Sequence, residues 1–292
     1  MTMPAPIHSG KVRDTYAAGD NLLMVASDRL SIFDVVLGET VPGKGAVLTA
    51  MTEFWLTKSP VKDIAPSHLV STDPADFPDW AKDLAGRAML VRKADMVPLE
   101  CIVRGYLVGS GWREYKEHGT LHGAKLPEGL QEGAELPEPL FTPSTKAELG
   151  AHDENISFEQ AEELAGADVA AQARDISLQA YKLAAAYARE KGILLLDTKL
   201  ELGWIDGKMS ICDEILTPDS SRFVDAATHE VGRPPLSMDK EYVRQWAMNA
   251  GWDKKPPAPT VPTDVIAKTS EIYADICKRL TGSAPSQPSE AK

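Results

Sequence analysis

The chain has 292 residues, 43% of them hydrophobic, and a formal net charge of −12. This length and composition allow one large domain, or two lobes that share a cleft, with a substantial buried core. The negative charge excludes non-specific nucleic-acid binding, because phosphates would be repelled, but a few converging Arg and Lys residues can still hold a small anionic substrate.

The first predicted element is a β-hairpin near the N-terminus. The alternating polarity of "KVRDTY", a Gly-containing turn and the apolar run "LLMVAS" are typical of two paired strands. Lys11 and Arg13 would lie on one strand face beside Gly10, where backbone N–H groups can approach phosphates. A purely structural hairpin fits the same residues, and neither a Walker A loop nor G-x-G-x-x-G occurs.

A helix over residues 48–58 is predicted from its apolar spacing, and one or two strands follow over residues 86–107, with Pro98 interrupting. The strand delivers Arg104 to a turn of small residues, "GSG", which contains Ser110 and leaves space for a ligand. The alternative is that Arg104 is a surface residue on an edge strand.

Residues 115–158 are rich in Gly and Pro and show little periodicity. An irregular segment of this length in a compact protein is often functional. It contains Lys146 and Asp153, and the composition alone favours a solvated loop for them.

The C-terminal half is predicted to hold helices on both sides of a second hairpin. Ser157 and Gln160 match a capping box at a helix start, and Lys191 and Gly192 match a helix end. Gly166 is predicted to divide this helix in two. Two more helices are predicted over residues 238–252 and 263–280, separated by a Pro-rich loop.

The second hairpin consists of "ILLLDTKLELGW" and "MSICDEIL" around the turn "IDGK". Strand alternation places Asp197, Lys199 and Glu201 on one face. A two-residue turn would pair Glu201 with Cys212, and a three-residue turn would pair Glu201 with Asp213. We predict the second register, which puts two carboxylates about 5 Å apart at Cβ.

Two carboxylates that face each other are destabilising unless a cation lies between them. Mg²⁺ binds one or two protein carboxylates and completes its shell with waters and phosphate oxygens. Glu201 and Asp213 are therefore candidate ligands of Mg²⁺. A solvated acidic strand edge is the alternative, although the apolar "ILLL" ahead of them favours a buried strand.

The stretch "TPDSSR" after Asp213 is predicted to be a Pro-Asp turn that presents Ser220 and Ser221 next to Arg222. The planar guanidinium suits a phosphate or carboxylate, and the serines add donors. A capped turn with a surface Arg fits the same residues.

The three cysteines, Cys101, Cys212 and Cys277, are widely spaced and form no metal-ligand pattern, so we expect reduced thiols in a cytoplasmic protein. The first residues lack the apolar run of a secretory signal, and no segment approaches the roughly 20 apolar residues that span a bilayer. We expect no membrane partner and no nucleic-acid partner.

Taken together and in order, these stretches resemble the phosphoribosylaminoimidazole-succinocarboxamide synthase (SAICAR synthetase) family. The resemblance covers roughly residues 8 to 280, and its "DENIS" loop is similar to the longer form of the family, which includes the fungal type. Val108 and Leu202 depart from the family's usual residues, and both changes are apolar. The stretches that carry the resemblance are "SGKVRDTY", "ASDRLSIFDVV", "MVPLECIVRGYLVGSGW", "FTPSTKAELGAHDENIS", "LLLDTKLELG" and "DEILTPDSSRF".

The resemblance implies an ATP-dependent ligase of de novo purine biosynthesis. It joins L-aspartate to the carboxylate of carboxyaminoimidazole ribotide (CAIR) and forms SAICAR, ADP and phosphate. An acyl phosphate is the expected intermediate, since a carboxylate must be activated before an amine attacks it. Positioning and charge neutralisation dominate such chemistry, so no nucleophilic Ser or Cys is required. The competing functions are a small-molecule kinase and a non-catalytic nucleotide-binding module.

The resemblance also implies roles for individual residues. Lys199, Lys146 and Asp153 are expected at the reacting groups, with the last two in a closing loop. The nucleotide is expected to contact Lys11, Arg13, Arg92, Lys93 and Met96, and to share Mg²⁺ with Glu201 and Asp213. CAIR is expected to contact Arg104, Ser110, Ser221, Arg222 and Arg244.

The implied fold is α+β, with two lobes and an ATP cleft between them. A smaller antiparallel-sheet lobe over residues 1–97 would cover the nucleotide, and a larger mixed α/β lobe over residues 98–280 would hold substrate and metal. Residues 281–292 are expected to be a flexible tail. The sequence leaves open whether the protein is a monomer or a homodimer.

Overall fold

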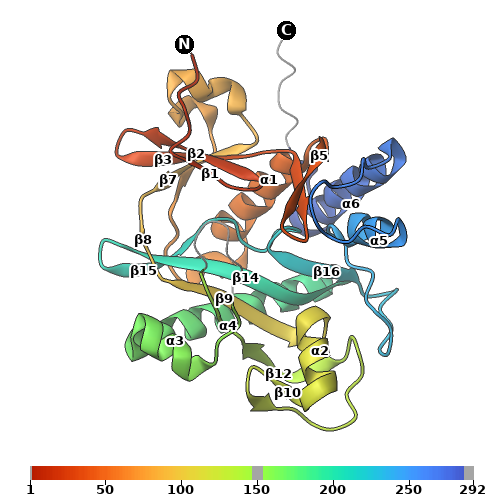
Figure 1. Ribbon diagram of the computed structural model, residues 1–292. Coiled ribbons are helices and arrows are strands. Elements are labelled where there is room, and N and C mark those ends of the chain that lie inside the picture. The colour runs from red at the N-terminus through yellow and green to blue at the C-terminus, as the bar shows by residue number, and fades with distance from the viewer. Residues whose placement is uncertain (1, 147–153, 286–292) are drawn as a thin grey trace.

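The computed structural model describes residues 2–146 and 154–285, and Figure 1 shows how their elements are arranged. The described residues form two larger antiparallel sheets, two small hairpins and six α-helices, which confirms the predicted α+β class. Within these two ranges, no helix is both long enough and apolar enough to cross a membrane. The division of the chain at residue 97 stays a prediction, and residues 286–292 of the predicted tail lie outside the described ranges.

The N-terminal hairpin is confirmed. It belongs to a five-stranded sheet of order β1 (His8–Ser9), β2 (Arg13–Ala18), β3 (Asn21–Ala26), β7 (Ala88–Arg92) and β6 (Leu69–Ser71). Lys11 lies outside these strands, so the prediction that it shares a strand face with Arg13 is wrong. The reason is a tight turn, in which the Gly10 amide donates to the Arg13 carbonyl over 2.7 Å.

The second sheet has seven strands and is built around the long strand β14 (Ile193–Ile205). The first part of β14 pairs with β9 (Leu99–Tyr106) and β16 (Ser221–Asp225), and its last part pairs with β15 (Lys208–Cys212) and β8 (Asp95–Met96). The partners of β14 therefore change near Lys199 and Glu201, where the sheet opens beside the site. β12 (Glu135–Phe141) and β13 (Ser144–Thr145) pair with β9.

The register predicted for the second hairpin is wrong. Glu201 pairs with Cys212, and the turn consists of Asp206 and Gly207 alone. Both turn residues have positive φ, 51° and 71°, as a two-residue type I′ turn requires. Asp213 consequently follows the end of β15 and adopts a left-handed conformation of its own, with φ 56°.

Two predictions about the middle of the chain are also corrected. The "GSG" stretch is the first turn of a helix, α2 (Gly109–His118), because Val108 ends the extended run and Gly109 can adopt φ 57°. Residues 115–158 contain strands where the sequence suggested irregular structure, since β12 and β13 find their partner in the distant strand β9. A small hairpin, β10 (Thr120–Leu121) and β11 (Ala124–Lys125), lies in the same region.

The helices α3 (Phe158–Ala165) and α4 (Ala167–Glu190) are labelled below strands β9 and β14 of the seven-stranded sheet in Figure 1. The capping box is confirmed, because Ser157 accepts from the Gln160 amide and Gln160 accepts in return. Gly166 separates the two helices as predicted. The buried face of α4 is mostly alanine, which allows close packing on the sheet.

The remaining helices frame the other side of the site. α1 (Lys44–Thr57) starts four residues before the predicted helix, and its fully buried Trp55 donates to the Leu216 carbonyl over 3.0 Å. The predicted C-terminal helices are confirmed as α5 (Glu241–Asn249) and α6 (Thr263–Thr281). Their apolar residues pack against a hairpin formed by β4 (Arg29–Ile32) and β5 (Val35–Thr40).

Candidate active site

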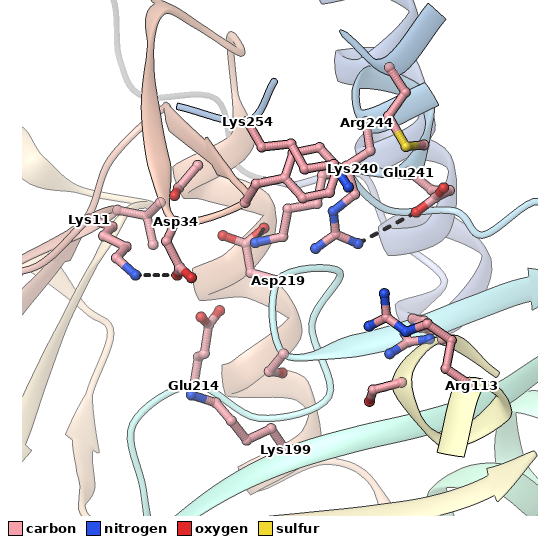
Figure 2. A pocket seen from close by; sticks show the side chains of 18 of the residues that line it. Lys11, Asp34, Arg113, Lys199, Glu214, Asp219, Lys240, Glu241, Arg244 and Lys254 are labelled. Atoms are coloured by element: carbon pink, nitrogen blue, oxygen red, sulfur yellow. Dashed lines mark hydrogen bonds and ion pairs between the residues drawn. The ribbon is translucent and has the colours of Figure 1, made fainter. Parts of the chain in front are cut away.

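Three adjoining cavities form the candidate site. The central cavity, of about 700 Å³, receives side chains from separate parts of the chain, as Figure 2 shows. The apolar cavity, of about 460 Å³, is walled in part by Leu22, Met24, Val91, Ala94 and Met96. The basic cavity, of about 180 Å³, is lined in part by Arg104, Lys199, Arg222, Lys240 and Arg244.

The cavities are joined by the residues they share. Glu201, Asp213 and Glu214 line both the central and the apolar cavity. Arg222, Lys240 and Arg244 line both the central and the basic cavity, whereas Lys199 lines all three. The row therefore runs from the apolar cavity to the basic cavity. Between them lie Glu201, Asp213 and Glu214, which we call the carboxylate junction.

The carboxylate junction is held by two cations from distant segments. Arg13 forms an ion pair with Asp213 and a second one with Glu214 over 2.8 Å, and Lys146 forms one with Glu201. Burial opposes ionisation of Glu201, but nearby Lys146, Lys199 and Arg13 outweigh it and hold its pKa below the usual range. Glu201 and Asp213 thus line one junction even though they are not cross-strand partners.

A buried carboxylate on β14 aligns two guanidinium groups of the basic cavity. Asp197 Oδ2 lies 3.2 Å from both Arg104 Nη1 and Arg222 Nη2. Arg104 also donates to Thr142 over 3.1 Å and to Ser110 over 3.3 Å. The sequence placed Asp197 on the right strand face, but it did not indicate this role, which depends on strands β9 and β16 flanking β14.

Lys199 projects from β14 where the three cavities meet. Its Nζ lies 2.8 Å from Glu100 Oε2, and Glu100 is buried. Burial raises the pKa of Glu100 despite the opposing effect of Lys199. Glu100 was not singled out by the sequence, although it lies within the "PLEC" stretch.

A second charged cluster, which the sequence analysis did not indicate, lies at the wall of the basic cavity. The side chain of Asp219 is 3% exposed, with Lys44 Nζ at 2.6 Å, Lys240 Nζ at 3.7 Å and the Tyr273 hydroxyl donating over 2.7 Å. Burial would raise the pKa of Asp219, but Lys240 and Lys44 outweigh it and hold the pKa well below the usual range. Two lysines share this carboxylate, and burial lowers the pKa of Lys240 against the opposing effect of Asp219.

The other candidate residues occupy different parts of the row. Lys11 lines the central and apolar cavities and pairs with Asp34, and Arg92 and Met96 line the apolar cavity. Ser221 is buried and shares a 2.7 Å hydrogen bond with Thr198, while lining the basic cavity. Arg244 lies 3.5 Å from Glu241 and points into the central cavity in Figure 2.

Two candidate residues remain apart from this row of contacts. Lys93 is exposed, on the connection between β7 and β8. Asp153 lies outside the described residues, so its predicted place in a closing loop has no structural account here.

His68 is a buried histidine in the wall of the apolar cavity. Burial and nearby Arg13 lower its pKa from 6.5 to about 4, against the opposing effect of Glu201. The imidazole is therefore neutral at physiological pH.

A depressed histidine pKa makes stability depend on pH. Between about pH 6.5 and 4 the unfolded chain binds a proton at His68 that the folded chain does not, so stability is lost as the pH falls through this window. We expect His68 to account for a decrease of about 3 kcal/mol in the free energy of unfolding. Urea denaturation of the wild type and His68→Gln at several pH values measures it, and equal slopes for both proteins would contradict it.

The carboxylates of the site fit a Mg²⁺ ion that is bound together with the phosphates of a nucleotide. Among the described residues, no group of three or more His, Cys, Asp or Glu could hold a metal ion by itself. Glu201 and Asp213 offer two carboxylates at the junction, and Mg²⁺ commonly uses one or two carboxylates together with phosphate oxygens and waters. The residues fit a metal shared with phosphates better than a site formed by protein alone.

A nucleoside fits the apolar cavity, phosphates fit the junction, and a small anion fits the basic cavity. Nucleotide-using enzymes that act on small anionic substrates are the class with these requirements. The family model of SAICAR synthetase matches residues 6–259. The chain therefore belongs to the SAICAR synthetase family, and it is a carbon–nitrogen ligase of purine biosynthesis.

Curated relatives agree over nearly the full length. The phosphoribosylaminoimidazole-succinocarboxamide synthase of Syntrophotalea carbinolica is 52% identical over 283 residues, covering 96% of this chain and 95% of the relative. The synthase of Thermodesulfovibrio yellowstonii is 51% identical over 279 residues, covering 94% of each.

Solved structures share the fold. A SAICAR synthase from Saccharomyces cerevisiae, complexed with SAICAR, matches with a TM-score of 0.87 and 39% identity, over 96% of this chain and 95% of the other. A type-2 structure of SAICAR synthetase in complex with ADP matches with a TM-score of 0.71 and 27% identity, over 96% and 99%.

Proposed function

We propose that this chain joins L-aspartate to the carboxylate of CAIR in the row of cavities described above. The γ-phosphoryl group of ATP passes to a carboxylate oxygen of CAIR, which gives an acyl phosphate and ADP. The aspartate amine then attacks the carbonyl carbon, phosphate leaves with its bridging oxygen, and the amine loses a proton. The product is the succinocarboxamide.

The main support for this proposal is the carboxylate junction, which lies between the apolar cavity and the basic cavity. Phosphoryl transfer requires donor and acceptor to be held in line, with their charges neutralised. ATP in the apolar cavity, with Arg92 and Met96 in its wall, directs its phosphates towards Lys11 and Arg13. CAIR in the basic cavity then lies across the junction from the γ-phosphate.

We assign the ribotide to the cationic residues around Asp197. Arg222 and Arg104 offer guanidinium forks, and Ser110 and Ser221 add hydroxyl groups. Arg244 and Lys240 extend this charge for the ribose phosphate, and Lys240 is an addition to the residues that the sequence indicated. Lys199 lies between both substrates and suits the charge that develops on the transferred phosphoryl group.

We assign Mg²⁺ to Glu201 and Asp213, with phosphate oxygens completing its shell. Bound there, the ion supplies neutralisation of the phosphate charge. The ion pairs of these carboxylates with Lys146 and Arg13 support this assignment, because both carboxylates are already paired with positive groups. Lys146, together with Asp153, is proposed to act on the reacting groups and on aspartate.

The test of the proposed function is ADP release from purified protein supplied with ATP, Mg²⁺ and CAIR, with and without L-aspartate. Release that requires both CAIR and aspartate is the expected result. Release with CAIR alone, unchanged by aspartate, would indicate a kinase, and binding of ATP without any release would indicate a non-catalytic module.

Gly109→Ala is expected to raise the KM for CAIR about tenfold, with little change in the KM for ATP. A Cβ atom at Gly109 would lie 2.3 Å from Arg222 Nη1, so the guanidinium must move away from its position beside Asp197. Steady-state kinetics measures both constants. Gly119→Ala is the matched control, since Gly119 also has positive φ, 70°, but a Cβ atom there meets nothing within 4 Å. Equal KM values for CAIR in both variants would contradict the placement of Arg222.

We place the reaction in the cytoplasm. All three cysteines are buried and free of disulfides, which fits a reducing compartment.

A further inference from the structure

His68 links the two large sheets at the wall of the apolar cavity. Its backbone amide donates to the Ile211 carbonyl of β15 over 3.0 Å, and its carbonyl accepts from the Arg92 amide of β7 over 2.7 Å. These two bonds hold the residue between the five-stranded and the seven-stranded sheet. The position of its side chain is therefore set by both walls of the cavity.

A nitrogen atom of the buried His68 imidazole has no hydrogen-bond partner among the described residues. The residue is only 4% exposed, and Nε2 has no hydrogen-bond partner among the described residues. Buried polar side-chain atoms are almost always hydrogen-bonded, so an orphaned one calls for an explanation. Nε2 itself has almost no exposed surface, but His68 lines the apolar cavity, so a small rotation of the imidazole lets a ligand there provide the missing partner.

The neighbours of His68 indicate which part of a ligand it meets. Phosphates would be drawn to Lys11, Arg13, Lys146 and Lys199, which line the same cavity with permanent positive charge. A neutral imidazole offers one donor and one acceptor instead, which suits an uncharged hydroxyl or ring nitrogen. Such groups belong to the nucleoside part of a nucleotide, and the apolar residues Leu22, Met24 and Val91, which line the same cavity as His68, suit a nucleoside as well.

We propose that His68 is a nucleoside-binding residue, whose imidazole hydrogen-bonds a ribose hydroxyl or a base nitrogen of ATP. This inference rests on the proposed function, since it takes ATP as the occupant of the apolar cavity. It adds a residue that the motifs of the sequence do not indicate, because no charge pattern or glycine accompanies "PSHLV".

The first test compares His68→Leu with His68→Gln in titrations with Mg·ADP by calorimetry. His68→Leu is expected to weaken ADP binding about tenfold, whereas His68→Gln, which keeps a donor and an acceptor, stays within about threefold of the wild type. CAIR affinity is expected to be unchanged in both. The melting temperature of unliganded His68→Leu should equal or exceed that of the wild type, because the substitution removes a buried polar group without a partner.

A purely structural histidine gives a different result. His68→Leu would then bind ADP like the wild type, or it would lose ADP and CAIR affinity together with stability, and either outcome overturns the proposal. Inorganic tripolyphosphate, which carries phosphates without a nucleoside, is the matched ligand. Its dissociation constant, measured by competition with Mg·ADP binding, should be the same in the wild type and His68→Leu, and a parallel loss would assign His68 to phosphates instead.

A measurement on the wild-type protein tests the contact without comparing the affinities of variants. Protein labelled with ¹⁵N-histidine should show one imidazole resonance, assigned with His68→Gln, that shifts on addition of Mg·ADP but not of tripolyphosphate. An unshifted resonance under saturating ADP would refute the contact. None of these readouts needs CAIR or aspartate turnover, so failure of the ligase reaction and failure of this inference are separately visible.

Discussion

Asp213→Asn is expected to lower kcat for aspartate-dependent ADP release at least about 100-fold. The substitution keeps the size of the side chain but removes a charged ligand from the junction where Mg²⁺ and the phosphates meet. Asn is preferable to Ala, because Asp213 has φ 56°, and Asn tolerates this left-handed conformation whereas Ala is strained in it. Steady-state assays at saturating ATP, CAIR and aspartate measure the effect.

The fold should survive this change. Arg13 keeps its 2.8 Å ion pair with Glu214, so the guanidinium retains one of its two carboxylates. Asp20→Asn is the control, since Asp20 is an exposed aspartate at the tip of the β2–β3 hairpin, away from the residues that line the three cavities. Wild-type turnover in Asp213→Asn would refute the metal assignment, and an equal loss in both variants would point to a general effect of removing a negative charge instead of the loss of a metal ligand.

Arg222→Met is expected to raise the KM for CAIR roughly 100-fold, while the KM for ATP changes by less than about threefold. The guanidinium is the exposed member of the pair that Asp197 aligns, and charge-assisted contacts to an anion are among the stronger hydrogen bonds. Asp197 keeps Arg104 at 3.2 Å, so the buried carboxylate is not left without a cation. Initial-rate kinetics with each substrate varied in turn separates the two constants.

Arg233→Met provides the control for overall charge. Arg233 is an exposed cation that pairs only locally with Glu230, three residues away, and its loss should leave both constants near the wild type. Equal increases in the KM for CAIR and for ATP in Arg222→Met would argue against a ribotide role and favour a general effect on the cleft.

Features that depend on neighbouring residues were predicted well. Ser157 and Gln160 form the capping box, and Gly166 separates α3 from α4, because helix ends are decided by interactions within one turn. The N-terminal hairpin and the two C-terminal helices follow from polarity alternation and apolar spacing in the same way.

The β14–β15 register shows how two sequence signals compete. The charge pattern favoured Glu201 opposite Asp213, whereas the Asp206-Gly207 dipeptide is typical of a two-residue type I′ turn. The structure follows the turn, because its backbone twist matches that of the strands and fixes the register for every pair after it. The carboxylates still reach one junction, through the left-handed residue Asp213 that follows the strand.

The order of the motifs in the sequence indicated the family to which the chain belongs. The residue types at Glu201 and Asp213 indicated carboxylates for a metal ion. Those at Arg104 and Arg222 indicated guanidinium groups for an anion. Only the tertiary structure decided which charges meet. Arg13 pairs with Asp213 across 200 residues of chain, and Lys44 pairs with Asp219 across 175. Such pairs leave no periodic or local signal, because sheet and helix packing, not spacing along the chain, brings their side chains together.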